Sequence, residues 1–201
     1  MITIWGRLNS HNVKKIAWAV IEMGLVHRRI DMGGSFGFTP GYLAMNPNRM
    51  IPTIEDNGLV LWESNAILRY LADAHAPDFR SSDPAERALG DKWMDWQFHF
   101  ADAQRDAFLG CVRQGKVGSE PAVARSAEAS CAMMALLDAE LATRPWLSGK
   151  RFGIADIPMG VYAHTFYTLP IPRPDLPHLA EWYARLRLRP GYPETVMIPL
   201  T

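Results

Sequence analysis

The first 75 residues combine short apolar runs with one longer stretch of helical spacing. Residues 2–5 and 27–31 predict short strands. Between them, four apolar residues recur at helical spacing before Gly24, a residue type that commonly follows the end of a helix: Val13, Ile16, Ala17 and Val20. A strand, a helix and a strand in this order predict a parallel pair with a right-handed crossover.

A second pair of strands is predicted farther along the chain. Residues 53–55 and 59–62 flank an Asp-Asn-Gly turn, which favours a β-hairpin, and a helix is expected over 65–75. Residues 32–45 contain four glycines and a proline, so we expect a loop there with a short helix at 42–45. The order β-α-β, loop, β-β-α is typical of thioredoxin-like domains.

The rest of the chain predicts helices only. From residue 84 onward it is rich in alanine, methionine and tryptophan and lacks strand-like alternation. Asp83, Pro84 and Glu86 form a typical helix start, with a cap, a first-turn proline and an acid three residues after the cap. Helices are predicted over 84–110, 120–142, 154–168 and 176–188, with a proline-rich connector at 169–177.

The expected architecture therefore has two domains. An N-terminal thioredoxin-like α/β domain occupies residues 1–76, a linker occupies 77–83, and a C-terminal all-helical bundle domain occupies 84–201. A length of 201 residues and a hydrophobic content of 48% suffice for packed cores of this size.

Charge and composition argue against several kinds of partner and site. The chain carries 21 basic and 21 acidic residues without a basic cluster, so neither nucleic acid nor a membrane is an expected partner. It shows no membrane span and no signal peptide, which favours a cytoplasmic protein. Cys111 and Cys131 form no Cys-x-x-Cys motif, and the six histidines show no ligand spacing. Neither a redox dithiol nor a metal site is therefore predicted.

Two backbone features in a fixed order predict a binding site. Ile51 precedes Pro52, and an extended residue before a proline can pair its backbone with an extended peptide. Glu63 and Ser64 open the helix after the hairpin, where a helix N-terminus attracts a carboxylate and Glu63 can accept from an ammonium group. Arg49 could hold a second carboxylate. The predicted ligand is a short peptide with an amino-acid head and a terminal carboxylate.

These segments, with others along nearly the whole chain, resemble the cytosolic glutathione transferase superfamily, and most of all its bacterial branch with a serine near the N-terminus. The resemblance is carried by residues 5–7, 9–13, 46–52, 61–67, 69–71, 144–147, 154–158 and 196–200. It implies glutathione as co-substrate, a small hydrophobic electrophile as second substrate and a two-fold homodimer. The helix after Glu63 and the long helix of the second domain would lie near the dimer interface.

The resemblance also implies roles for single residues. The Ile51 backbone would pair with the cysteinyl unit of glutathione ahead of a cis Pro52. Glu63 and Ser64 would bind the γ-glutamyl head. Arg49 would approach the glycyl carboxylate.

The thiol chemistry is expected just past the first strand. Asn9, Ser10 or Asn12 can cap the helix that begins there. In serine-type members of the family, a serine at this place donates a hydrogen bond to the glutathione sulfur, which implies Ser10 as the catalytic residue, with Asn12 as the alternative. Such a bond favours thiolate over thiol.

The electrophile pocket is predicted between the first loop and the long helix. Its candidate residues are Trp5, Arg7, Leu8, Trp96, His99, Phe100, Arg105 and Phe108. Because most aromatic residues on such a helix belong to the core, we expect a minority of them to touch substrate. Arg105 and His99 are candidates for favouring a substrate with developing negative charge.

One position departs from the family pattern. Gly153 stands where the family usually has a serine or threonine that caps the helix containing Asp156. Glycine offers no side-chain acceptor, so Asp156 can supply only its half of the capping box. We expect this difference to affect stability and folding and to leave catalysis unchanged.

The sequence thus predicts a transferase that conjugates glutathione to a small hydrophobic electrophile. Two alternatives stay open: a glutathione-dependent disulfide reductase or peroxidase of the same fold, and a non-catalytic binding module. The absence of a cysteine near Ser10 weakens a protein-thiol mechanism. The presence of Ser10, Pro52, Glu63 and Ser64 together argues against a non-catalytic module.

Overall fold

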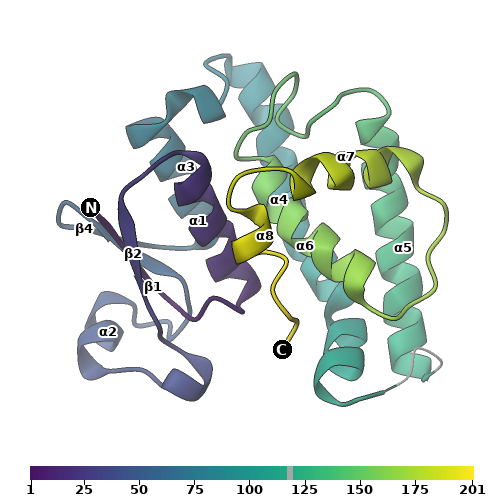
Figure 1. Cartoon of the computed structure of the whole chain (residues 1–201), viewed down its shortest axis with the longest axis horizontal. Helices are drawn as coiled ribbons and strands as arrows, with labels where there is room; N and C mark the ends of the chain where they lie inside the picture. The colour runs from purple at the N-terminus through teal and green to yellow at the C-terminus, as the bar shows by residue number, and fades with distance from the viewer. Residues whose placement is uncertain (117–119) are drawn as a thin grey trace.

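A computed structural model of the protein describes residues 1–116 and 120–201. A four-stranded sheet with its helices lies beside a bundle of longer helices (Figure 1). This is the predicted fold class, a thioredoxin-like α/β domain followed by an all-helical domain. In the described ranges, no helix combines the length and the apolar character needed to cross a membrane.

The first half contains the predicted strands and helices, with ends within two residues of the predicted ones. Its elements are β1 (Ile2–Trp5), α1 (His11–Glu22), β2 (His27–Ile30), the 3-10 turn η1 (Gly34–Phe36), α2 (Pro40–Met45), β3 (Thr53–Asp56), β4 (Leu59–Trp62) and α3 (Ser64–His75). The strand order is β2-β1-β3-β4. β1 is parallel to β2 and antiparallel to β3, so the predicted β-α-β unit and hairpin are confirmed.

The alternation of side chains places helices on both faces of this sheet. Ile4 lies opposite Ile54 in the register, and both are fully buried in the core that includes α1 and α3. Trp5 lies opposite Thr53 on the other face. There Tyr42 of α2 packs against Trp5, with 6.2 Å between ring centroids, and its hydroxyl lies 2.9 Å from Thr53 Oγ1.

The second half consists of helices joined by loops. Its elements are the 3-10 turn η2 (Pro77–Phe79), α4 (Pro84–Phe108), the π-helical turn η3 (Leu109–Arg113), α5 (Pro121–Leu141), α6 (Asp156–Thr168), α7 (Pro177–Arg187) and α8 (Tyr192–Thr195). Three details differ from the predictions. The predicted linker contains η2, the predicted helix 84–110 gives way to a π-helical turn at Leu109, and α8 was not predicted, because Gly191 and Pro193 indicate a turn.

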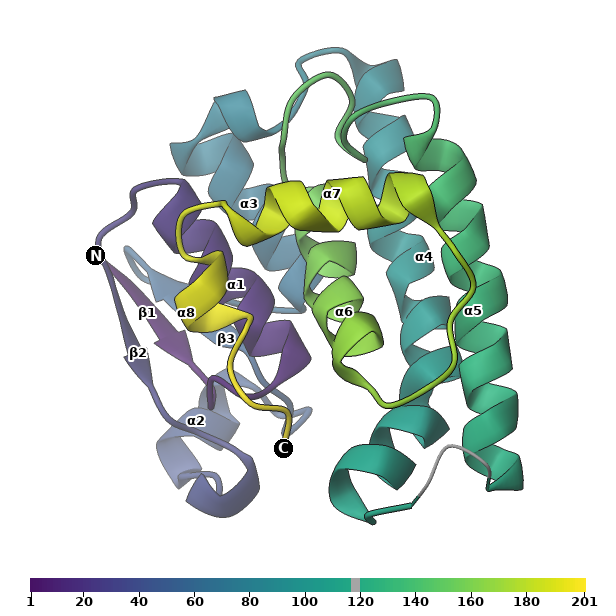
Figure 2. The ribbon, with the colours of Figure 1, turned by 45° about the vertical axis from the view of Figure 1, so that its right-hand side comes forward.

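Helix α1 forms the junction between the two halves. It packs against α3 on the sheet side and against α6 and α8 on the other (Figure 2). Every residue from 13 to 20 is therefore buried, including Lys14 and Lys15. Trp18 is fully buried there, and its Nε1 donates to Glu22 Oε1 over 2.9 Å and to the Pro190 carbonyl oxygen over 3.1 Å.

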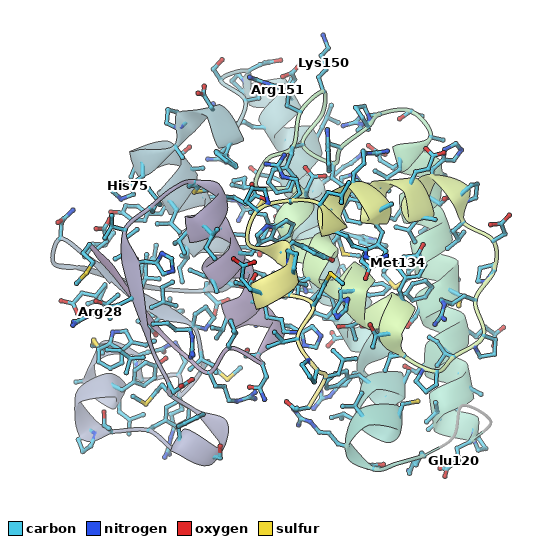
Figure 3. The ribbon with its side chains drawn as sticks, viewed as in Figure 1. Arg28, His75, Glu120, Met134, Lys150 and Arg151 are labelled. Atoms are coloured by element: carbon cyan, nitrogen blue, oxygen red, sulfur yellow. The ribbon has the colours of Figure 1, made fainter. Side chains whose placement is uncertain are left out.

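The helical half has a well-filled interior. The side chain of Met134 on α5 is fully buried inside the bundle, whereas Lys150 and Arg151 project outward from the loop before α6 (Figure 3). Asp156, the first residue of α6, is also fully buried. Its carboxylate accepts from the Leu147 backbone N–H over 2.8 Å and from Trp182 Nε1 over 2.9 Å, which ties α6 to the preceding loop and to α7.

The start of α6 explains the unusual Gly153. Asp156 Oδ2 accepts from the Gly153 N–H over 3.2 Å, which is its half of the capping box. A Cβ at position 153 would lie 2.5 Å from the Phe79 carbonyl oxygen. The missing hydroxyl comes instead from Ser148, whose Oγ accepts from the Ala155 N–H over 3.1 Å. The side-chain acceptor at the start of α6 is therefore supplied by Ser148 in the preceding loop and not by residue 153.

Candidate functional site

The segment before β3 is held in an extended shape by α2. The Ile51–Pro52 peptide bond is cis, as the resemblance implies. Tyr42 donates to the Met50 carbonyl oxygen, and Asn46 Nδ2 donates to that oxygen over 3.1 Å and to Thr53 Oγ1 over 3.0 Å. Burial raises the pKa of Tyr42, so its hydroxyl stays protonated and keeps donating. The N–H and C=O of Ile51 hydrogen-bond to no residue that the structure describes and can pair with a ligand backbone.

Backbone strain marks both ends of the hairpin region. Glu63, the residue before α3, has φ of 72°, and Arg49 has φ of 58°. Such angles in residues other than glycine cost on the order of 1–3 kcal/mol and concentrate at functional sites. Both side chains are exposed, and their carboxylate and guanidinium groups are accessible to a ligand.

The N-termini of α1 and α3 meet at a hydrogen bond. Ser64 Oγ donates to Asn12 Oδ1 over 3.3 Å, so the first residue of α3 contacts the second residue of α1. Ser10 lies at the N-cap of α1 in an extended conformation, and its side chain makes no capping hydrogen bond. The two parts of the predicted site, around Ser10 and around Glu63, are therefore adjacent.

A buried lysine lies beneath this junction. The Nζ of Lys15 donates to Ser64 Oγ over 3.2 Å and to the side-chain oxygens of Asn65 and Gln97. Burial lowers the pKa of Lys15 to about 7, and the nearby Glu63 carboxylate partly opposes this effect. Helical periodicity predicts that a lysine beside apolar positions lies on the solvent face, so the sequence pattern does not identify Lys15 as a site residue.

A pocket of about 150 Å³ opens beside the first turn of α1. Its lining residues come from α1, the end of α4, η3 and α6: His11, Ala101, Gln104, Arg105, Phe108, Leu109 and Tyr162. The His11 ring stacks on Tyr162, with centroids 4.7 Å apart, and meets Phe108 edge-on at 5.2 Å. His11 Nε2 also lies 2.7 Å from Thr165 Oγ1. His11 directly follows Ser10, so the pocket borders the predicted thiol site.

Charges of both signs act on the pocket walls. Positive groups act on His11, whereas burial and the Asp102 carboxylate raise the pKa of Tyr162. Burial, followed by the charges of Lys14 and Lys15, lowers the pKa of His11 to about 3, so its imidazole is neutral at physiological pH. Arg113 acts in the same direction and lies over the Phe108 ring, 5.7 Å from its centroid.

The predicted pocket residues separate into two groups. Arg105 and Phe108 line the pocket. Trp96 stacks with Phe100 inside the helical half, with centroids 6.2 Å apart, and His99 is exposed outside the lining. Trp5 packs on α2, Arg7 donates to Asn9 Oδ1 over 2.6 Å, and Leu8 is half-buried.

Sequence reasoning did not select His11, Gln104 or Tyr162 as pocket residues. The position of His11 next to Ser10 was the one available signal, whereas the places of Gln104 and Tyr162 depend on how α4 packs against α6.

Other kinds of chemical centre have no support in the described residues. Within 1–116 and 120–201, no three His, Cys, Asp or Glu side chains converge as metal ligands would. Burial raises the pKa of the Cys111 and Cys131 thiols, which opposes thiolate formation at either position. Neither cysteine lines the pocket beside His11.

Two family models and several known proteins match the chain. The models are the N-terminal domain of glutathione S-transferase, over residues 9–74, and its C-terminal domain, over residues 120–185. The glutathione S-transferase GstB of Escherichia coli is 39% identical, and the alignment covers 100% of both chains. The disulfide-bond oxidoreductase YfcG of the same species is 28% identical, over 90% of this chain and 87% of that one. Among solved structures, the glutathione-bound theta class glutathione S-transferase of Xanthomonas axonopodis pv. citri has a TM-score of 0.93 and 50% identity, covering 100% of this chain and 99% of that one.

Proposed function

The chain belongs to the glutathione S-transferase family and is a glutathione-binding transferase, and we propose that Ser10 stabilises the glutathione thiolate for attack on a small hydrophobic electrophile. The observation that carries this proposal is the hydrogen bond from Ser64 to Asn12, because it joins the peptide-binding half of the site to the half that contains Ser10. A thiolate held at Ser10 would also lie next to the pocket lined by His11. The protein would thus hold both reactants together in one site.

We place glutathione along the segment from Arg49 to Ser64. The unpaired backbone of Ile51 supports pairing with the cysteinyl unit. The strained Glu63 and the N-terminus of α3 support binding of the γ-glutamyl ammonium and carboxylate groups. The exposed guanidinium of Arg49 would approach the glycyl carboxylate.

The choice of Ser10 over Asn12 rests on how each side chain is used. The Ser10 side chain makes no capping bond, whereas Asn12 Oδ1 already accepts from Ser64. Lowering a thiol pKa by about 2 units needs about 2.7 kcal/mol of preference for the anion. A hydrogen bond to a charged group supplies roughly 1.5–3 kcal/mol, and a helix N-terminus adds up to about 1 kcal/mol. One hydroxyl at the start of α1 is therefore sufficient.

An ultraviolet titration of the thiolate of bound glutathione tests this assignment. We expect Ser10→Ala to raise the thiol pKa by about 2 units, toward the value near 8.5 of a free thiol. Asn12→Ala should leave it within about half a unit, provided that calorimetry still detects glutathione binding. An unchanged thiol pKa of bound glutathione in Ser10→Ala would indicate that Asn12 stabilises the thiolate in place of Ser10.

A glutathione-dependent disulfide reductase is the second candidate. It is favoured by the similarity to a protein named a disulfide-bond oxidoreductase. The raised thiol pKa values of Cys111 and Cys131 argue against a protein thiol in such a reaction, so two glutathione molecules would have to carry it. Turnover of a mixed glutathione disulfide, compared with that of a chlorinated aromatic, distinguishes the two activities.

We also propose that the chain belongs to the serine-type bacterial branch of the family and that it forms a homodimer. Three exposed apolar side chains support the homodimer: Met50, Trp62 and Phe98, which are 60%, 38% and 43% exposed. Exposed apolar patches commonly mark protein interfaces. Light scattering should give twice the monomer mass. A monomeric Phe98→Lys variant that keeps its fold would locate the interface.

Two further proposals concern domain bounds and location. The bounds 1–76 and 84–201 are supported by the end of α3 at His75 and the start of α4 at Pro84. A cytoplasmic location is proposed as well, and fractionation of cells that produce the chain tests it.

A further inference from the structure

We propose that the second substrate is a planar electrophile the size of one aromatic ring that carries an anionic group such as a carboxylate. This inference rests on the proposed function, because the pocket that takes this substrate borders the thiolate held at Ser10. It adds the chemical class of the electrophile. The size, the inner wall and the mouth of the pocket each support one part of it.

The pocket fits a single flat ring. Its volume of about 150 Å³ equals that of an apolar cavity known to bind benzene in another protein. The stacked rings of His11 and Tyr162 form one wall, and Phe108 stands edge-on to His11. Aromatic rings favour such stacked and edge-on neighbours.

The inner wall contains an unpaired donor. Gln104 is only 2% exposed, lines the pocket, and its Nε2 has no hydrogen-bond partner among the described residues. Buried polar groups are nearly always paired, so the unpaired amide of this lining residue is available to a ligand group once the side chain turns toward the pocket. A nitro or carbonyl oxygen on the ring would accept from Gln104. These groups also activate an aromatic carbon toward thiolate attack.

The mouth of the pocket carries an arginine. Arg105 is exposed there and forms no ion pair with any described residue, although Asp102 and Asp106 lie on the same helix. The Arg113 guanidinium lies 5.7 Å from the centroid of the Phe108 ring. Because His11 is neutral, Arg105 is the charged residue among the described residues that line the pocket. A carboxylate on the outer end of the ring would reach Arg105 while the ring stays inside.

The reaction of such a substrate needs no reagent other than glutathione. Glutathione loses its thiol proton to solvent on binding near Ser10. The sulfur then forms a bond to the ring carbon that bears a halogen. The carbon–halogen bond breaks, and the halide leaves with the bonding electron pair.

Two matched substrates test the anionic group. They are chlorodinitrobenzoate, with chlorine para to the carboxylate, and the corresponding neutral amide. For each, kcat/KM is divided by the uncatalysed rate constant, which removes intrinsic reactivity. We expect the wild type to prefer the carboxylate about three- to tenfold, and Arg105→Gln to reduce this preference to about one. Arg125→Gln, on the exposed face of α5, should keep the wild-type preference. Equal use of both substrates by the wild type would overturn the proposal.

A binding measurement separates this inference from the proposed function. Dinitrobenzoate and dinitrobenzamide lack the chlorine and cannot react, so calorimetry reports the pocket alone. The carboxylate should bind about three- to tenfold more tightly than the amide, and Arg105→Gln should abolish the difference. Equal affinities would reject the anionic substrate even if transferase activity is present. Loss of glutathione binding in a separate titration would instead reject the proposed function.

Gln104→Met tests the inner wall. The variant keeps the volume of the side chain and removes the unpaired donor, so we expect a higher melting temperature together with affinities for both dinitro compounds that are lower by about fivefold. Unchanged affinities would remove Gln104 from the ligand contacts.

Discussion

The ammonium nitrogen of Lys15 lies 3.2 Å from the hydroxyl oxygen of Ser64, which places a buried basic group from α1 beneath the N-terminus of α3. No carboxylate of the described residues pairs with it, and its other hydrogen-bond partners are the amide oxygens of Asn65 and Gln97. Because the side chain is fully buried, its protonation carries a cost that depends on pH.

The stability of the protein should rise with pH above neutrality. Lys15 has a pKa of about 7 in the folded protein, against about 10.4 when unfolded. Between these values the unfolded state binds more protons, so raising the pH favours the folded state. From pH 7 to 8.5 we expect Lys15 to contribute an increase of about 1.5 kcal/mol in the free energy of unfolding. Lys14, with a pKa of about 8, acts in the same direction.

Urea unfolding of the wild type and Lys15→Met at pH 7 and 8.5 checks this expectation. The variant should retain only the smaller increase due to Lys14. Lys92→Met, at an exposed lysine of α4, should behave as the wild type. A variant with the full wild-type increase would show that Lys15 keeps its proton in the folded state.

Lys15→Met should also weaken glutathione binding. The positive charge of Lys15 lies beneath the α3 N-terminus, where we place the γ-glutamyl carboxylate, and it favours an anion there. We expect a three- to tenfold rise in the dissociation constant measured by calorimetry at pH 6.5, and a smaller rise at pH 8.5, where Lys15 is mostly neutral. An affinity ratio that does not change with pH would exclude an electrostatic role.

On the acid side, stability should fall because of buried neutral histidines. Burial lowers the pKa of His164 to about 4, while an unfolded histidine titrates near 6.5. Below pH 6.5 the unfolded state therefore gains protons that the folded state does not, and the free energy of unfolding decreases. His164 should account for about 2 kcal/mol between pH 6.5 and 4.5. His11, with a pKa of about 3, adds a loss of the same sign.

His164→Asn isolates this contribution. The substitution removes the bond between His164 Nδ1 and the Tyr183 hydroxyl at every pH, so the informative quantity is the change in unfolding free energy between pH 6.5 and 4.5. That change should shrink by about 2 kcal/mol relative to the wild type. His178→Asn, at an exposed position of α7, should leave it unaltered. An undiminished change in His164→Asn would mean that His164 is protonated in the folded state.

Local pattern predicted the elements because the forces that set them are local. The turn before Leu59, the cap at Asp83 and the prolines around 169–177 act within a few residues, and the structure has the corresponding hairpin, helix start and connector. The cis bond at Pro52 followed from family resemblance, since no local force distinguishes it from a trans bond.

The parts that sequence could not predict depend on contacts between distant segments. Lys14 and Lys15 are buried because α3 and α6 cover opposite sides of α1. The apolar pattern of a helix predicts burial on one face only, so it does not predict the burial of these lysines. Tyr162 reaches the pocket beside His11 because α6 packs against both α1 and α4. His99 and Arg105 lie on one helix, yet only Arg105 lines that pocket, because the packing of α4 decides which of its faces meets α1.

The start of α6 offers a last prediction, which opposes the family pattern. Restoring a serine at position 153 should destabilise the protein by about 1–3 kcal/mol, because the added Cβ would lie 2.5 Å from the Phe79 carbonyl oxygen. Ser148→Ala should cost about 1 kcal/mol, because it removes the acceptor for the Ala155 N–H. Gly41→Ser is the matched control, since a Cβ there meets no atom within 4 Å. Urea unfolding at pH 7 measures all three changes. A stabilised Gly153→Ser variant would mean that the Phe79 carbonyl can move aside and that Ser148 does not replace the family's cap.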